Sequence, residues 1–384
     1  MKATVVIIGA GPAGLATSVC LSCQSITNIL LEREDYAASL WKKHAYDRLH
    51  MHLAKEFCQL PYMPHQSKTP TFMPKNTFIN YIDNYISFFK INPSYNRCVQ
   101  CAFFDKSSQQ WIVKAKNYSS GEIESYFAKF LVVATGENDK SFIPNVLGMD
   151  SFPGEIIHSS QYKSGAVYNG KDVLVVGSGN SGMEISFDLS NYGARTAIVV
   201  RSSLHVVTRE MVYLGMLLLI HLSLPIRLVD VLITLLSKIM YGNLSKYGLY
   251  RPSVGPFTHK FISGKAPVID VGTIKKIRSG KIKVVPAINN VNGNMVVFDN
   301  GTKQHFDVIV FATGFRSGTN DWLKDYHYIF NEDGMPKNRI PNHWKGENGI
   351  YCVGFARNGL PGISVDAKAV AEDINAILSN QISE

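Results

Sequence analysis

Short apolar runs that end in glycine-rich turns recur along the chain. Residues 4–8 form a β-branched run that leads into a Gly-x-Gly-x-x-Gly motif, and residues 172–176 lead into a second motif of the same kind. Each motif is followed by helix-compatible sequence and then by another apolar run, at 28–31 and 196–200. Apolar runs bounded by turns are typical of buried parallel strands. The pattern predicts two dinucleotide-binding units, because strand, glycine turn, helix and strand occur in the required order in both.

The similarity between the two halves extends beyond the glycine motifs. Residues 130–136 and 308–314 are apolar runs that both end in Ala-Thr-Gly, where small residues allow the chain to turn close to a ligand. A further strand is expected at 349–353 and a terminal amphipathic helix at 366–378. Because parallel strands need crossover connections, the tail should return to the first sheet. The second unit is then inserted into the first.

The residue that ends the second strand of each unit indicates which nucleotide binds. In the first unit this residue is Glu32, whose carboxylate can accept hydrogen bonds from the ribose hydroxyls of FAD or NAD. In the second unit Arg201 stands at the corresponding place, followed by two serines. An arginine can bind a 2′-phosphate that a carboxylate would repel, so the second unit is predicted to bind NADPH.

We therefore expect an α/β fold with two Rossmann-like domains, the NADPH domain inserted into the FAD domain. The expected boundaries are 1–164 for the first part of the FAD domain, 165–305 for the NADPH domain and 306–384 for the second part of the FAD domain. The residues expected at FAD are Gly9, Ala10, Gly11, Pro12, Ala13, Gly14, Glu32, Arg33, Trp41 and Asp366. Those expected at NADPH are Gly177, Ser178, Gly179, Asn180, Ser181, Gly182 and Arg201. For Trp41, stacking beside the cofactor and ordinary core packing both remain open.

Composition and charge narrow the partners. The 384 residues are 46% hydrophobic and 18% charged, which suits a globular protein of two or three domains rather than a disordered chain. The formal net charge of +9 admits anionic partners, but the basic residues are scattered in ones and twos rather than gathered in a dense run. Nucleic acid is therefore not expected, and two nucleotides with an acidic substrate are sufficient anions.

The six cysteines do not indicate redox or metal chemistry. The pair Cys20/Cys23 follows the first glycine motif, beside the expected phosphates, and Cys98/Cys101 falls outside both motifs. Neither pair suits a disulfide reductase, and no second pair at zinc-ribbon spacing accompanies them. No metal is expected.

An apolar stretch at 211–226 is the strongest candidate for membrane contact. His221 and Pro225 interrupt it before it reaches the length of about 20 residues that a membrane span needs. We expect two buried or pocket-covering helices over 211–240 and no transmembrane span. Peripheral membrane contact is the alternative. The expected location is cytoplasmic, and association with the endoplasmic reticulum stays open.

The segment before the second glycine motif carries a more specific pattern. Phe152, Gly154, His158 and Tyr162 match the FxGxxxHxxx(F/Y) signature of class B flavin-containing monooxygenases, which this chain resembles. The resemblance is closest to the plant YUCCA flavin monooxygenases and covers essentially the whole chain. The segments that carry it are residues 9–14, 39–41, 57–61, 134–138, 177–184, 264–272 and 311–314.

This resemblance implies FAD and NADPH as cofactors, O2 as co-substrate and an aryl keto acid as substrate. The implied reaction is oxidative decarboxylation of indole-3-pyruvate to indole-3-acetate, the hormone auxin, through a flavin C4a-peroxide. Two alternatives stay open: a general N- or S-oxygenating monooxygenase, and a catalytically silent flavoprotein that binds nucleotides as a scaffold.

One catalytic candidate follows from a departure within the wider class. Animal-type members carry an Asn near the flavin before a Ser-Lys-Glu; the corresponding stretch here is 50–56, with His52 at the Asn position. A histidine can hold or release a proton near neutral pH, so His52 is the candidate catalytic residue, with a structural role as the alternative. His158 is expected to hold the linker rather than take part in chemistry.

Overall fold

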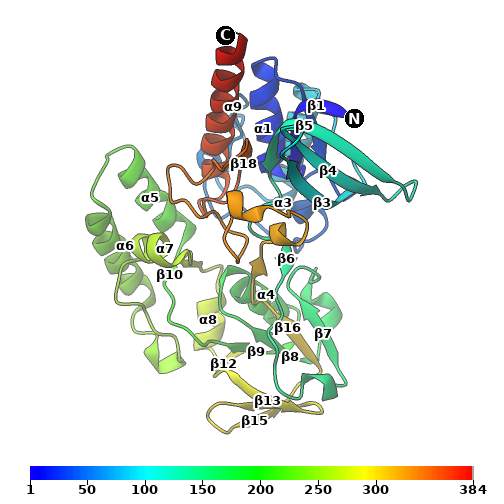
Figure 1. The fold of residues 1–384 in the computed structure, drawn as a ribbon. Helices are drawn as coiled ribbons and strands as arrows, with labels where there is room; N and C mark the ends of the chain where they lie inside the picture. Colours follow the sequence, from blue (N-terminus) through cyan, green and yellow to red (C-terminus); the bar gives the residue numbers. More distant parts are fainter. Residues whose placement is uncertain (383–384) are drawn as a thin grey trace. The chain divides into compact units, whose positions relative to one another are not determined.

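The computed structural model describes residues 1–382, and the chain divides into two compact units. Unit 1 comprises Met1–Lys43, Lys55–Lys140 and the chain from Phe315 onward, and unit 2 comprises His44–Ala54 and Ser141–Gly314. Both are built on a largely parallel sheet with helices packed against it (Figure 1). The predicted α/β fold with two Rossmann-like units, one inserted into the other, is confirmed.

The sheet of unit 1 has the strand order β2-β1-β5-β4-β3, and β18 also pairs with β5. Strands β1, β2 and β18 run parallel to their neighbours, whereas β3, β4 and β5 form an antiparallel meander. Helix α1 follows the first glycine motif and packs against α9 (Figure 1). The return of the C-terminal strand to the first sheet is as predicted, since Ile350–Cys352 aligns with Leu131–Val133.

The bounds of the elements in or bordering unit 1 are as follows. The strands are β1 (Lys2–Ile8), β2 (Asn28–Leu31), β3 (Arg97–Asp105), β4 (Gln110–Asn117), β5 (Ile123–Val133), β6 (Lys140–Ser141), β17 (Phe315–Arg316) and β18 (Ile350–Cys352). The helices are α1 (Pro12–Cys23), α2 (Ser39–Lys42), α3 (Lys75–Phe88) and α9 (Leu360–Ile382). Helix α9 begins earlier than the predicted 366, because Pro361 is tolerated in a first turn, where the missing N–H has no intrahelical partner anyway.

Unit 2 is centred on a five-stranded sheet of order β12-β9-β8-β16-β7, in which every neighbouring pair is parallel. Its strands are β7 (Glu155–His158), β8 (Asp172–Val176), β9 (Arg195–Val199), β12 (Ile282–Val285) and β16 (Val308–Phe311). A separate meander comprises β13 (Ile288–Asn292), β14 (Met295–Phe298) and β15 (Lys303–His305), and β10 (Val206–Val207) pairs with β11 (Val268–Ile269). The helices are α4 (Asn180–Asn191), α5 (Arg209–Ile220), α6 (Ile226–Tyr241), α7 (Pro256–Ser263) and α8 (Thr273–Arg278).

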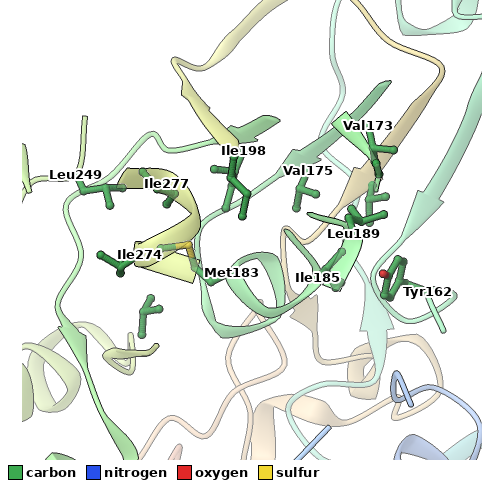
Figure 2. Packing of buried hydrophobic residues seen from close by; sticks show 14 of the residues in the cluster. Tyr162, Val173, Val175, Met183, Ile185, Leu189, Ile198, Leu249, Ile274 and Ile277 are labelled. Atoms are coloured by element: carbon green, nitrogen blue, oxygen red, sulfur yellow. The ribbon is translucent and has the colours of Figure 1, made fainter. Parts of the chain in front are cut away.

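Alternate side chains of the central strands enter two different cores. Val173, Val175 and Ile198 meet residues of α4 and α8, among them Met183 and Ile274 (Figure 2). Their neighbours along the strands pack on the opposite face against the meander residues Val291, Val296 and Phe298. Burial on both faces explains why these strands read as continuous apolar runs rather than as an alternating pattern.

Two helices do form over 211–240, as predicted, but of the two expected roles, buried or pocket-covering, full burial is wrong. Helix α6 buries Val229 and Ile233 but exposes Val231, Leu235 and Ile239. The helical period places these groups on opposite sides, and only one side has neighbouring protein. Among the described residues, no helix is both long and apolar enough to cross a bilayer.

The observed units differ in their boundaries from the expected 1–164, 165–305 and 306–384. Strands β7 and β16 pair within the sheet of unit 2, although both were expected outside the NADPH domain. Residues 44–54 also belong to unit 2. Strand partners are non-local, and buried parallel strands resemble one another in sequence, so periodicity alone does not reveal to which sheet a strand belongs.

Candidate functional site

The two glycine loops share one backbone geometry. Gly9 has a φ of +103°, and a Cβ at this position would lie 2.7 Å from the carbonyl oxygen of Ala134. Gly177 has a φ of +115°, and a Cβ there would lie 2.4 Å from the carbonyl oxygen of Ala312. Each loop therefore turns directly against the Ala-Thr-Gly segment of its own unit. The sequence repeat corresponds to one repeated structural device.

Both loops lead into a helix whose first turn is open to a ligand. Helices α1 and α4 begin after Gly11 and Gly179, and neither N-cap is satisfied by a side chain. A Cβ at Gly11 or Gly179 would meet no protein atom within 4 Å. By contrast, a Cβ at Gly14 would lie 1.9 Å from the carbonyl oxygen of Gly9. Free backbone N–H groups, a positive helix end and space for an anion together fit the pyrophosphate of a dinucleotide.

The remaining motif residues shape the two loops. Pro12 opens α1, Ala13 is buried, and Ser181 lies in the first turn of α4 beside Gly182. The side chain of Asn180 donates to the carbonyl of Pro267 at 3.2 Å and accepts from the N–H of Ile269 at 2.7 Å. Asn180 thereby ties the second glycine loop to the segment 264–272.

Glu32 lies directly after β2 and is buried. Its carboxylate accepts hydrogen bonds from the N–H of Ala10 at 2.7 Å and from the N–H of Glu34 at 3.0 Å. Burial raises the pKa of Glu32. The carboxylate therefore ties the glycine loop to the end of β2, and a carboxylate has further lone pairs that can accept from ribose hydroxyls. The adjacent Arg33 forms an ion pair with Asp139 at 2.8 Å.

Arg201 occupies the corresponding place in unit 2 but has a different environment. It is exposed, as are Ser202 and Ser203, and it follows the end of β9. No acidic residue stands between the end of β9 and Ser203. The end of this strand is thus a positively charged, accessible site next to the open N-terminus of α4.

Two other residues expected at FAD lie in unit 1 with clear protein partners. Trp41 makes an edge-on contact with Phe78 of α3, with 4.9 Å between the ring centroids. Asp366 is buried in α9, 3.1 Å from Nε2 of His343, and accepts from the N–H of Gly354 at 3.4 Å. Packing against α3 explains the half-buried position of Trp41 without a ligand.

The four residues of the signature linker lie in unit 2 and have structural contacts. Phe152 is buried against the meander, and a Cβ on Gly154 would lie 2.2 Å from the carbonyl oxygen of Asp307. His158 is buried, and its Nε2 donates to the carbonyl of Gly314 at 3.0 Å while its Nδ1 accepts from the N–H of Ser160 at 3.2 Å. Burial lowers the pKa of His158, so the neutral ring is favoured.

The hydroxyl of Tyr162 donates to Asp188 of α4 at 2.7 Å. This bond ties the end of the linker to the helix that follows the second glycine motif. The linker residues therefore brace the second glycine loop from the side of β7 and from the side of α4.

His52 lies in unit 2, and its Nε2 is 2.9 Å from Oε1 of Glu184 on α4. The side chain of His52 is 26% exposed, whereas that of Glu184 is 1% exposed. The sequence prediction did not include Glu184. Its signal was a carboxylate placed between Met183 and Ile185, two core positions of α4, where an apolar residue is the ordinary choice.

Known proteins share both the sequence pattern and the fold of this chain. Residues 2–327 match the family described as flavin-binding monooxygenase-like. The chain is 58% identical over 380 residues to the probable indole-3-pyruvate monooxygenase YUCCA10 of Arabidopsis thaliana, with 99% of both chains covered. It is 48% identical to the probable indole-3-pyruvate monooxygenase YUCCA8 of the same plant, covering 97% of this chain and 88% of the relative.

The chain belongs to the flavin-binding monooxygenase-like family, among the YUCCA proteins. Its structure is also similar to that of a flavin-containing monooxygenase from Stenotrophomonas maltophilia, with a TM-score of 0.74, 19% identity and coverage of 98% and 99% of the two chains. That similarity supports the fold. Within this family the protein is a flavin-dependent monooxygenase with FAD and NADPH as cofactors. The resemblance noted in the sequence is confirmed.

Proposed function

We propose that this protein catalyses the oxidative decarboxylation of indole-3-pyruvate. The reaction converts indole-3-pyruvate, O2, NADPH and a proton into indole-3-acetate, CO2, water and NADP⁺. The observation that carries this proposal is the 58% identity over nearly the full length to a probable indole-3-pyruvate monooxygenase. Two open, glycine-lined helix N-termini, one in each unit, support it because the reaction needs two nucleotides.

In this proposal unit 1 binds FAD and unit 2 binds NADPH. The free N–H groups at the starts of α1 and α4 hold the two pyrophosphates, with Glu32 at the FAD ribose and Arg201 at the 2′-phosphate of NADPH. The chemistry that bound FAD supplies is acceptance of hydride from NADPH and activation of O2. The protein contributes the orientation of both nucleotides and control of protons. We assign proton control to His52, because its side chain is partly exposed and its Nε2 contacts the buried carboxylate of Glu184.

The substrate class is tested with purified protein loaded with FAD. Consumption of NADPH is measured with indole-3-pyruvate, with a tertiary amine and with an organic sulfide as separate substrates. We expect rapid turnover with the keto acid and formation of indole-3-acetate. Turnover on the amine or sulfide with none on the keto acid would indicate a general N- or S-oxygenating enzyme instead. A flavin-loaded protein that consumes no NADPH with any of the three would be a silent scaffold.

We further propose that the protein is cytoplasmic and contacts a membrane surface, such as that of the endoplasmic reticulum, peripherally through α6. The outward side of this helix carries the exposed Leu228, Val231, Leu235 and Ile239. Within residues 211–265 the only acidic side chain is Asp230, which is buried and accepts hydrogen bonds from the start of α7. Helix α6 also carries the exposed Arg227 and Lys238. An apolar helix face flanked by positive charge suits an anionic lipid surface.

Co-sedimentation with vesicles tests this contact. We expect binding to anionic phospholipid vesicles that weakens with salt, little binding to phosphatidylcholine vesicles, and loss of binding in Val231→Glu. Val167→Glu is the control, because Val167 is 71% exposed and Val231 is 68% exposed, but Val167 lies outside α6. Equal losses in both variants, or no sedimentation of the unaltered protein, would contradict the proposal. Self-association that depends on Val231 would indicate a second copy of the chain as the partner of this face.

A further inference from the structure

The candidate catalytic residue His52 contacts a buried carboxylate, that of Glu184. Glu184 belongs to the second turn of α4, directly after the glycine motif, and is almost fully enclosed. Its Oε1 lies 2.9 Å from Nε2 of His52. A buried carboxylate needs hydrogen-bond donors, because unsatisfied charge in the interior is costly. His52 supplies one of these donors from a segment that is distant in sequence.

Tyr46 supplies a second donor to the same carboxylate. Its hydroxyl is hydrogen-bonded to Glu184, and burial together with the negative charge of Glu184 raises the pKa of Tyr46 well above its ordinary value. The phenol is therefore protonated and donates. Arg48 and Arg209 are the positively charged groups whose fields also reach Tyr46. Tyr46 and His52, both from the segment 44–54, are the titratable groups hydrogen-bonded to Glu184.

The ring of His52 is held on one side only. Nε2 is directed to Glu184, and Nδ1 has no protein partner among residues 1–382. Donation from Nε2 to a carboxylate fixes which ring nitrogen carries the proton in the neutral form. Proton exchange then takes place at Nδ1, on the exposed side of the ring.

We infer that Glu184 is a positioning residue that fixes the tautomer of His52, so that Nδ1 is the atom that takes up or releases a proton. The inference rests on the proposed function, in which His52 controls protons during oxygenation. Glu184 itself contacts no reacting atom in this account. Tyr46 is the second hydrogen-bond donor to this carboxylate.

The direct test is the tautomer of His52, measured by NMR in the full chain loaded with FAD and selectively labelled with ¹⁵N in the histidine rings. The signal is assigned with His52→Asn. In the unaltered protein we expect the neutral ring to carry its proton on Nε2. In Glu184→Gln, which keeps the shape but removes the charge, we expect a mixture of tautomers, because a neutral amide holds the Nε2 proton less strongly than a carboxylate does.

The functional arm is the comparison of kcat and KM with indole-3-pyruvate. We expect Glu184→Gln to lower kcat by about tenfold or more. The KM for NADPH should change little, because the glycine-lined N-terminus of α4 is unaltered in this variant. An unchanged tautomer in Glu184→Gln would overturn the inference, as would a changed tautomer with an unchanged kcat.

Asp188→Asn is the matched control. Asp188 lies one turn further along α4, is also buried, and accepts hydrogen bonds from Tyr162 and the N–H of Gly165. This variant should leave the tautomer of His52 unchanged. Should Glu184→Gln fold poorly, Tyr46→Phe keeps the carboxylate, and the neutral ring of His52 should then still carry its proton on Nε2; loss of that tautomer would count against Glu184. If the unaltered protein forms no indole-3-acetate, the proposed function fails while the NMR arm still reports on Glu184.

Discussion

At the scale of single residues, the preference for NADPH is assigned to Arg201. Replacing it with Ala removes a charge-assisted contact to a phosphate, which corresponds to about 1.5–3 kcal/mol, or a rise of roughly 10- to 150-fold in the Kd for NADPH. The Kd for NADH should change little, and titration of the FAD-loaded protein with each nucleotide measures both. Arg195→Ala, at the other end of β9, is the control, because Arg195 is paired with Asp172. Equal losses for NADPH and NADH would remove the assignment.

A second prediction at this scale concerns His158 and acid stability. Burial lowers the pKa of His158 below its usual 6.5, so the unfolded chain takes up a proton first as the pH falls. Stability is therefore lost as the pH drops from about 6.5 toward the lower pKa of the folded state. His158→Gln can still donate to Gly314 and should show a shallower fall in Tm between pH 7 and pH 5. Identical slopes would show that His158 does not contribute.

Residue identities could be predicted where they belong to a local pattern. The glycines, Glu32 and Arg201 follow from position relative to predicted strands. The contact between His52 and Glu184 could not be, because it joins distant segments and depends on the path of residues 44–54 into unit 2. The fold brings the histidine to the carboxylate, and no periodicity in either segment encodes that meeting.

At the scale of elements, substitutions at the start of each glycine-lined helix should affect cofactor binding and folding separately. Gly11→Ala places a methyl group where no protein atom lies within 4 Å, so we expect an unchanged Tm for the cofactor-free protein and loss of FAD absorbance. Gly14→Ala would place its Cβ 1.9 Å from a backbone oxygen, so we expect a lowered Tm as well. Gly179→Ala should retain FAD and lose NADPH. If Gly11→Ala and Gly179→Ala both retain both cofactors, the proposal that the N-termini of α1 and α4 bind the pyrophosphates would be contradicted.

The type of each element was more predictable than its burial or its sheet. Helices over 211–240 were expected from their apolar residues, but burial depends on which neighbours reach them, and α6 leaves Val231 and Leu235 exposed. Strand β16 was recognisable as an apolar run, yet its partners β8 and β7 both lie in unit 2. Local sequence predicts strand and helix, whereas sheet membership depends on contacts distant in the chain.

At the scale of the whole molecule, we propose that unit 1 binds the flavin and unit 2 binds the reducing agent of this monooxygenase. The net charge of +9 is compatible with two dinucleotides and a carboxylate substrate. Coupling of NADPH oxidation to product formation distinguishes such an enzyme from a flavoprotein that oxidises NADPH without oxygenating a substrate. The central claim therefore concerns the fate of both oxygen atoms and of the reducing equivalents.

The most direct measurement supplies the FAD-loaded protein with NADPH, indole-3-pyruvate and ¹⁸O2, and quantifies NADP⁺, CO2 and indole-3-acetate together. The account predicts equal amounts of all three products, with one labelled oxygen in the carboxylate of the acid. Consumption of NADPH with hydrogen peroxide as the product, and no labelled indole-3-acetate, would contradict it.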